Sequence, residues 1–271
     1  MGNDRAIAFI GGGNMATSLV GGLLDAGWDP GAITVSDPGE DKRGALADRF
    51  GVRVTADNGE AAGGADTVVL AVKPQVLQMV AGEVGRAVKD EPPLVISVAA
   101  GVRVESLRQW LGVAAPLVRV MPNTPALVGA GVSALYAGDD VGGPARAEAE
   151  RIMRAAGDAV WVAREEQMDA VTAVSGSGPA YFFLILEALE EAGVAEGLDR
   201  ETARTLAVQT AAGSAALARE SGDPPAVLRA RVTSPGGTTG QGLAALERGG
   251  LRAAFLDAVG AAARRSRELG G

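Results

Sequence analysis

The chain has 271 residues, 47% apolar and 21% charged, enough for a buried core in one large or two ordinary domains. It contains no cysteine and no histidine, which excludes disulfides, thiolate nucleophiles, imidazole catalysis and zinc sites with nitrogen or sulfur ligands. The net charge of −8 argues against nucleic acid or an anionic membrane as a partner. No run approaches 18 apolar residues and the first ten residues lack a signal-peptide pattern, so we expect no membrane span and a cytoplasmic location.

The first half alternates short β-branched apolar runs with helical stretches, which is typical of βαβ units on a parallel sheet. Helices are expected to open near Asn14, Asp41, Gln75 and Val104. The expected strands cover residues 6–10, 33–36, 52–54, 67–72, 94–98 and 117–120. A further strand pair, 132–136 and 159–162, flanks a helix over 144–155 and extends the sheet. The pattern predicts an α/β, Rossmann-type, doubly wound fold.

After about residue 164 the strand pattern disappears and helical periodicity takes over. Helices are expected over 179–192, 200–219 and 251–269. The first of these is apolar nearly all round, so it should be buried centrally or against a partner subunit. We therefore expect a dinucleotide-binding domain at 1–163 and an all-α dimerisation domain at 164–271, in a homodimer or a higher homo-oligomer.

A glycine-rich turn follows the first predicted strand directly, in the pattern Gly-x-Gly-x-x-Ala from Gly11 to Ala16. Gly11 permits a tight turn, Gly13 lets a pyrophosphate approach the backbone, and Ala16 lets the helix pack on the strand. An ordinary glycine-rich turn is the alternative in a chain with 39 glycines. The position between a strand and a helix favours a dinucleotide site.

The second predicted strand ends at Asp37, where nicotinamide cofactors are discriminated. A carboxylate there accepts hydrogen bonds from a ribose 2′-hydroxyl, which favours NAD. It repels a 2′-phosphate unless Lys42 or Arg43, one helical turn onward, folds back over it. These residue types leave both NAD and NADP possible.

Four further stretches have the composition of ligand-binding segments. Ala-Val-Lys-Pro-Gln at 71–75 and Val-Ala-Ala-Gly at 98–101 close the fourth and fifth predicted strands, at the sheet edge where ligands bind. Ser-Gly-Ser-Gly-Pro-Ala at 175–180 opens the long apolar helix. Ser-Pro-Gly-Gly-Thr-Thr at 234–239 precedes another helix and offers amides and hydroxyls to a carboxylate. The last two are alternatively helix-entry loops whose serine and glycine only cap.

Together with the glycine turn, these stretches resemble the pyrroline-5-carboxylate reductase family. The resemblance runs from residue 7 to about 269 and is most specific at 229–250 and 169–181. It implies NADPH, or NADH, as cofactor and no metal. The implied cofactor contacts are Gly11, Gly12, Gly13, Asn14 and Met15 at the pyrophosphate, Asp37 at the 2′-ribose, Asn58 at the adenosine, Val72, Lys73 and Pro74 in the groove, and Ala99 and Ala100 at the nicotinamide. The implied substrate pocket comprises Glu165, Gly236, Gly237, Thr238 and Thr239.

The resemblance implies hydride transfer to the C=N carbon of 1-pyrroline-5-carboxylate, giving L-proline, so the protein would be an oxidoreductase acting on CH–NH groups. Thr238 and Ser177 are the two candidates for hydrogen bonding the ring nitrogen. Lys73 is expected to hold cofactor phosphate or ribose rather than act as an essential amine. Two positions depart from the family pattern. Asp37 is acidic, and Arg231 stands where the family can carry an uncharged amide near the cofactor. Arg231 is therefore a further expected cofactor contact, whose guanidinium would supply positive charge from across a subunit interface.

Two other interpretations compete with this one. A reductase of the β-hydroxyacid dehydrogenase type needs a lysine in the helical domain, and no lysine follows Lys89. A dinucleotide-sensing protein without turnover would keep the fold. The Ser-Pro-Gly-Gly-Thr-Thr stretch argues against this second alternative.

Overall fold

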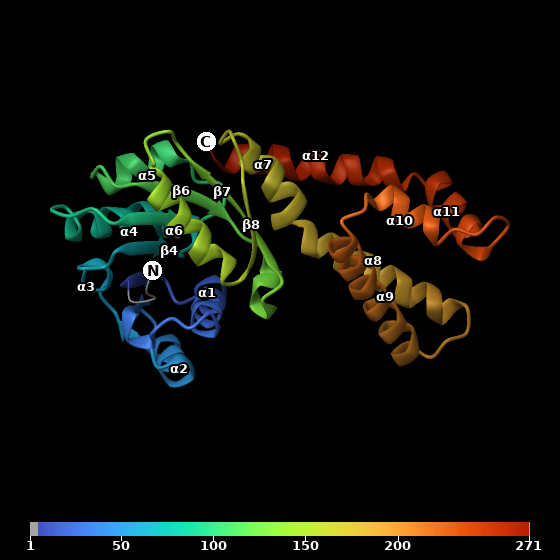
Figure 1. Ribbon diagram of the computed structural model, residues 1–271, viewed down its shortest axis with the longest axis horizontal. Helices are drawn as coiled ribbons and strands as arrows, with labels where there is room; N and C mark the ends of the chain where they lie inside the picture. Colours follow the sequence, from blue (N-terminus) through green and yellow to red (C-terminus); the bar gives the residue numbers. More distant parts are fainter. Residues whose placement is uncertain (1–4, 271) are drawn as a thin grey trace. The chain divides into compact units, whose positions relative to one another are not determined.

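The computed structural model describes residues 5–270 of the chain, which form two compact units (Figure 1). The sheet unit extends to Ser177 and resumes at Ala262, and the helical unit is Gly178–Ala261. The final helix therefore contributes residues to both units.

The sheet unit is built on eight strands, in the order β3-β2-β1-β4-β5-β6-β7-β8. Their bounds are β1 Ile7–Ile10, β2 Ile33–Ser36, β3 Arg53–Thr55, β4 Thr67–Leu70, β5 Leu94–Ser97, β6 Leu117–Met121, β7 Gly131–Ala137 and β8 Gly157–Trp161. The chain runs from β1 outward to β3, then returns to β4 on the other side of β1. This doubly wound order confirms the Rossmann-type fold expected from the sequence.

The sheet is not parallel throughout, because β7 runs antiparallel to β6 while β8 is parallel to β7. Only a short connection with the 3₁₀-helix η2, Thr124–Val128, joins β6 to β7. A connection without a crossover helix brings the chain back antiparallel, whereas α6, Gly143–Arg154, provides the crossover to β8.

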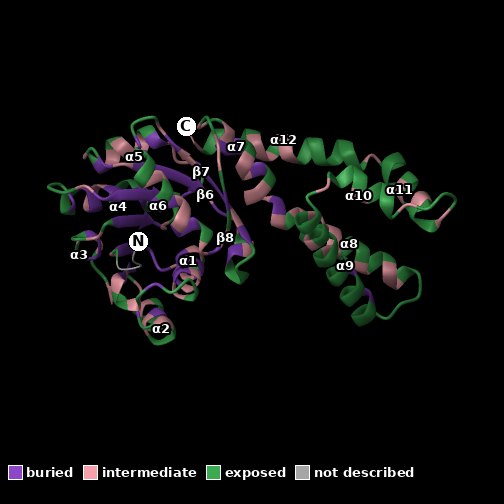
Figure 2. Ribbon diagram, viewed as in Figure 1, coloured by how far each residue is buried: buried purple, intermediate pink, exposed green. Residues whose placement is uncertain are grey.

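Helices cover both faces of the sheet, so β1, β4 and β5 are buried along their whole length (Figure 2). Alternate strand residues enter two cores: Phe9 packs with α1, Asn14–Asp25, and with α6, whereas Ala8 and Ile10 pack with α4, Pro74–Ala87, and with α5, Val104–Leu111. The outer helices are α2, Glu40–Phe50, and α3, Asn58–Ala62.

The entry to the long apolar helix is helical rather than a loop, which corrects the helix-entry interpretation of residues 175–180. Helix α7, Gln167–Val171, continues through a π-helical turn, Thr172–Gly176, into α8, Gly178–Ala195. The Ser177 N–H donates to the Thr172 carbonyl at 2.8 Å, five residues back. Single π turns inside α-helices are frequently found at functional sites.

The compact units divide after Ser177, whereas the sequence suggested a boundary near residue 164. Helix α7 and the π turn contact each other, and α7 also contacts β7. The first helical residues after β8 therefore pack on the sheet unit.

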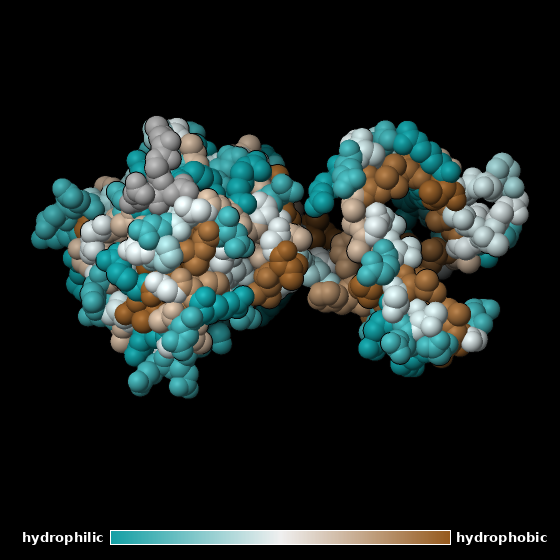
Figure 3. Space-filling view, turned by 60° about the horizontal axis from the view of Figure 1, so that its bottom comes forward, coloured by the Kyte–Doolittle hydropathy of each residue, from teal (hydrophilic) through white to brown (hydrophobic). Residues whose placement is uncertain are grey.

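The helical unit contains α8, α9 Arg200–Ser221, α10 Pro225–Arg231, α11 Thr238–Arg248 and the first part of α12 Leu251–Leu269. Small residues such as Ala203 and Ala207 are buried in α9, which packs closely on α8. Some large apolar side chains of this unit are exposed to solvent: Phe182, Phe183 and Leu184 are each about two-thirds exposed. Figure 3 shows such side chains gathered on this unit. By length and composition alone, the helical stretch Gln167–Ala195 would also suffice to cross a membrane.

Candidate functional site

The turn after β1 requires glycine at its first position. Gly11 has a φ of +102°, and its N–H donates to the Ser36 carbonyl at 2.8 Å. A Cβ at Gly11 would lie 2.8 Å from the Ala71 carbonyl oxygen and 2.9 Å from Val72 Cγ1. The turn is thereby fixed between the ends of β2 and β4, where the strand order reverses and open α/β sheets bind ligands.

The turn leads directly into α1, and its residues fit a dinucleotide pyrophosphate. Gly13 precedes the helix in an extended conformation, and no side chain caps the amides of Asn14 and Met15. A Cβ at Gly13 would meet no atom within 4 Å, so the backbone is open to a ligand on that side. Free amides at the positive end of a helix dipole are an anion site.

Asp37 holds this turn in place from the end of β2. Its side chain is 7% exposed. Oδ2 accepts the Gly12 N–H at 3.0 Å, and Oδ1 accepts the Gly39 N–H at 2.9 Å. A carboxylate that accepts two backbone amides orders both the glycine turn and the start of α2.

The two cations one turn beyond Asp37 fold back toward it. Lys42 Nζ lies 3.5 Å from Asp37 Oδ2. Arg43 Nη1 donates to the backbone carbonyls of Asp37 at 2.7 Å and Pro38 at 2.9 Å. The end of β2 therefore carries two positive charges beside a single buried carboxylate.

Asn58 begins α3 beside the end of β2. Its Oδ1 accepts from Ser36 Oγ at 2.7 Å, and its Nδ2 donates to Glu83 Oε2 at 2.7 Å. The carboxamide thus ties β2 to α4, and it borders a hollow of about 550 Å³ that Asp57, Glu83 and Arg86 also line.

The other expected cofactor residues follow β4 and β5 at the same edge of the sheet. Val72 is half-buried, whereas Lys73 and Pro74 are exposed where α4 begins. Ala99 is buried and Ala100 is exposed in the loop after β5. Parallel strands place these segments with the glycine turn, as the sequence led us to expect.

Glu165 is engaged inside the sheet unit. Its Oε1 accepts from Arg119 Nη1 at 2.9 Å and from the Val104 N–H at 2.8 Å. The Arg119 and Glu165 side chains are 6% and 15% exposed. Glu165 therefore pairs with a buried arginine and satisfies the first amide of α5. Sequence reasoning missed Arg119, although a charged residue in the apolar run 117–121 was the available signal.

Asn123 is a second residue that sequence reasoning missed. Its Oδ1 accepts the Val132 N–H at 2.9 Å, and its Nδ2 donates to Ser175 Oγ at 3.3 Å. It connects the segment after β6 to the π turn that ends beside Ser177. The Pro-Asn-Thr-Pro sequence at 122–125 was the available signal, because prolines on both sides fix a turn.

The Ser-Pro-Gly-Gly-Thr-Thr stretch lies in the helical unit and forms an open helix N-terminus. Gly236 has a φ of +73°, and the Gly237 N–H donates to the Ser234 carbonyl at 3.1 Å. Thr238 and Thr239 are exposed at the start of α11, and no side chain caps this helix. Backbone amides and hydroxyls there suit a carboxylate.

Arg231 also belongs to the helical unit, at the end of α10. Its Nη1 donates to Asp223 Oδ2, and its side chain is 59% exposed. The guanidinium is therefore paired within its own unit.

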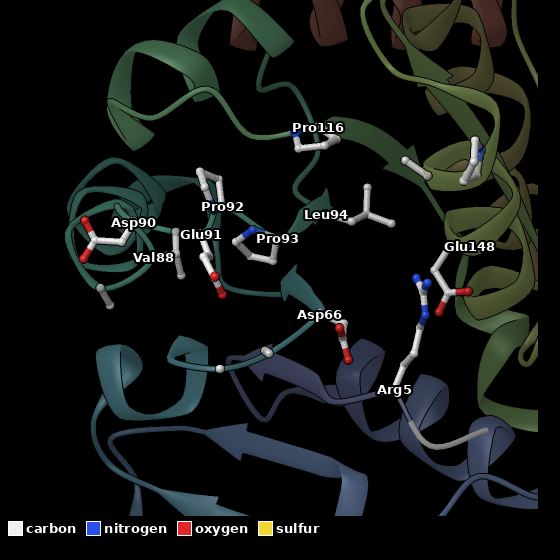
Figure 4. A pocket seen from close by; sticks show the side chains of 15 residues that line it. Arg5, Asp66, Val88, Asp90, Glu91, Pro92, Pro93, Leu94, Pro116 and Glu148 are labelled. Atoms are coloured by element: carbon white, nitrogen blue, oxygen red, sulfur yellow. The ribbon is translucent and has the colours of Figure 1, made fainter. Parts of the chain in front are cut away.

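A hollow of about 760 Å³ lies at the opposite edge of the sheet, where Asp66, Leu94 and Pro116 stand at the beginnings of strands (Figure 4). The first turn of α6 also lines this hollow, through Pro144 and Ala145, but the glycine turn after β1 does not. Within residues 5–270 no group of three or more acidic residues is placed to hold a metal ion.

Two family profiles match the chain. One, described as "Pyrroline-5-carboxylate reductase dimerisation", covers residues 165–269. The other, described as "NADP oxidoreductase coenzyme F420-dependent", covers residues 6–101. They correspond to the helical region and to the segment from β1 to the loop after β5.

Among curated proteins, a pyrroline-5-carboxylate reductase of Pseudomonas aeruginosa is 48% identical over 97% of this chain and 96% of its own length. One of Methanosarcina acetivorans is 42% identical over 98% of both. The structure superposes on a pyrroline-5-carboxylate reductase from Coxiella burnetii with a TM-score of 0.95 and 46% identity, covering 99% of both chains. A Plasmodium falciparum pyrroline carboxylate reductase with NADP bound gives a TM-score of 0.86 and 30% identity, again over 99% of both. The chain therefore belongs to the pyrroline-5-carboxylate reductase family.

Proposed function

We propose that the protein reduces 1-pyrroline-5-carboxylate to L-proline with NADPH or NADH, the last step of proline biosynthesis. The observation that carries the proposal is the glycine turn, held against β4 in a chain 48% identical to a curated reductase along almost its whole length. When bound, the reduced nicotinamide supplies a hydride to the C=N carbon.

The chain's own residues bind and orient the reactants. The amides that follow Gly13 hold the pyrophosphate, and Ala99 and Ala100 offer a surface small enough for the nicotinamide ring. Lys73, exposed where α4 begins, contacts cofactor phosphate or ribose. Holding two reactants in contact removes much of the entropic barrier, so no proton relay is required for the hydride step.

The substrate carboxylate binds at the N-terminus of α11. Gly236 and Gly237 expose the backbone there, and Thr238 and Thr239 add hydroxyls. Thr238 Oγ1 hydrogen bonds the ring nitrogen, with Ser177 as the second candidate. An imine is basic enough to arrive protonated, so a chain without histidine and cysteine still has an electrophile to reduce.

Thr238→Val tests this assignment. We expect a higher KM for the imine and a lower kcat with little change in cofactor affinity, since only the substrate loses a partner. Gln241→Ala is the control, because Gln241 is exposed on the same helix and lies outside the proposed pocket. Wild-type kinetics in Thr238→Val would refute its role.

Absorbance of the reduced nicotinamide tests the reaction itself. Mixing the protein with pyrroline carboxylate and NADPH or NADH should oxidise at least one cofactor and form proline. No oxidation of either would overturn the proposal, and a binding protein without turnover would then remain. We place the reaction in the cytoplasm, which fractionation of the producing cells tests.

The helical region assembles the subunits as a homodimer, or a higher homo-oligomer. The dimerisation profile covers 165–269, and the exposed faces of α8 and α12 include Phe182, Phe183 and Leu256 at 65%, 65% and 75% exposure. Pairing with a second copy would bury these side chains, which exceed what a monomer normally leaves in water. Light scattering that gives a monomer at micromolar concentration would contradict this assembly.

A further inference from the structure

The loop after β5, residues 98–103, is contacted by two segments that follow β8 in the chain, one at its α5 end and one at its tip. At the α5 end, the Val104 N–H is bound by Glu165, which also pairs with Arg119 on β6. These bonds fix where α5 begins. They leave the tip of the loop, at Ala100 and Gly101, to be positioned by something else.

The last turn of α12 contacts the tip of this loop. Gly101 is buried with a φ of +78°, and a Cβ there would lie 3.5 Å from Leu269 Cβ. A Cβ on Gly270 would lie only 2.8 Å from the Gly101 carbonyl oxygen. The end of the final helix therefore lies directly on the tip of the loop.

A buried polar pair sets the position of this helix end. Ser266 Oγ donates to Asp169 Oδ1 at 2.7 Å, and the two residues are 4% and 7% exposed. Apolar contacts alone would let α12 slide or rotate, whereas a single buried hydrogen bond specifies its register. Asp169 lies on α7, four residues after Glu165, so one short segment anchors both the beginning of α5 and the end of α12.

We propose that residues 266–270 are a clamp that positions the loop after β5 against the nicotinamide ring, and that Ser266 and Gly270 are positioning residues for hydride transfer. The assignment of the loop to the nicotinamide rests on the proposed function. The clamp explains why a polar pair is buried at the end of a helix and why Gly270 has no room for a side chain.

Ser266→Ala and Gly270→Ala test the clamp, with Arg264→Ala, at an exposed position of the same helix, as the control. Binding is measured for NADPH and for 2′-phospho-ADP-ribose, which lacks the nicotinamide. We expect the variants to bind NADPH about fivefold to tenfold more weakly than wild type, a change comparable to the free energy of roughly one hydrogen bond. The affinity for 2′-phospho-ADP-ribose should stay at the wild-type value. The kcat should fall by about tenfold to a hundredfold, and the isotope effect with deuterated NADPH should rise, because hydride transfer becomes slower.

If the variants bind both ligands equally more weakly, Ser266 and Gly270 have a general structural role and the proposal is overturned. Unchanged binding of both ligands would overturn it as well. If Ser266→Ala does not fold, Gly270→Ala decides alone, since it alters only the last turn. Inactivity of the wild-type protein with pyrroline carboxylate would refute the proposed reaction, but the comparison of the two ligands would still decide the clamp.

Discussion

Removing the Glu165 side chain should cost more stability than an ordinary surface substitution. In Glu165→Ala, the Arg119 side chain, which is only 6% exposed, loses its carboxylate partner at 2.9 Å, while the Val104 N–H loses its acceptor. Breaking a buried ion pair from one side costs about 3–5 kcal/mol. Since Glu165 is itself 15% exposed, we take the lower value of about 3 kcal/mol.

The assay is thermal unfolding of the full chain. For a domain of this size, about 1 kcal/mol lowers the Tm by roughly 2–4 °C, so Glu165→Ala should lose about 6–12 °C. Glu166→Ala, at the exposed neighbouring position, should stay within about 1 °C of wild type. The double variant Glu165→Leu with Arg119→Leu should recover most of the loss, because no charge remains buried.

A Glu165→Ala protein with the Tm of wild type, or a double variant no more stable than the single one, would refute the reasoning. Kinetics separate this role from that of a substrate ligand. If Glu165 instead contacts the imine, Glu165→Gln raises the KM for the imine at an unchanged Tm.

Three further predictions follow from the glycine turn, from Asp37 and from Glu190. Gly11→Ala should abolish dinucleotide binding and lower the free energy of unfolding by about 1–3 kcal/mol, because Gly11 has a φ of +102° and the new Cβ would lie 2.8 Å from the Ala71 oxygen. Gly13→Ala should keep the Tm of wild type and weaken only NADPH binding, measured by fluorescence titration. Asp37→Asn should raise the ratio of kcat/KM for NADPH to that for NADH by about tenfold, since one negative charge is removed near the 2′-position; an unchanged ratio would contradict this. Hydrogen bonds from Arg204 and Arg200 lower the pKa of Glu190, so its stabilisation is full above the usual glutamate pKa, about 4.3, and is lost as the pH falls through the lower folded-state pKa. Glu190→Gln should therefore lower the Tm at pH 7 but converge with wild type in acid, and a pH-independent difference would argue against it.

The sequence predicted the strands and main helices well because each βα unit has a local hydrophobic period. Gly11 could be assigned from the sequence alone, since a strand, a tight turn and a helix dictate its conformation. The antiparallel pairing of β7 could not be predicted, because strand direction there depends on a connection whose path has no periodic signature. The π turn before Ser177 was also hidden, since its bond to Thr172 differs from an ordinary helical bond by one residue only.

Candidate site residues were harder to assign when their partners are distant in sequence. Glu165 is separated by 46 residues from Arg119 and by 61 from the Val104 amide. A carboxylate beside a diagnostic motif is equally compatible with a substrate ligand and with an internal ion pair. Only the fold shows that Oε1 already has two donors, and this makes the structural role the stronger expectation.

Asp37, at the expected cofactor site, is a second residue whose role depends on contacts that the sequence does not show. An acidic residue after the second strand favours NAD if its carboxylate is free to meet the ribose. Here one oxygen accepts the Gly12 N–H of the glycine turn, the other accepts the Gly39 N–H at the start of α2, and Lys42 lies 3.5 Å from the first. The carboxylate is therefore committed to the fold before a cofactor binds, and its charge is partly balanced. Cofactor preference at this position depends on how Lys42 and Arg43 share their charge between Asp37, the backbone carbonyls and a 2′-phosphate, so the residue type alone does not decide it.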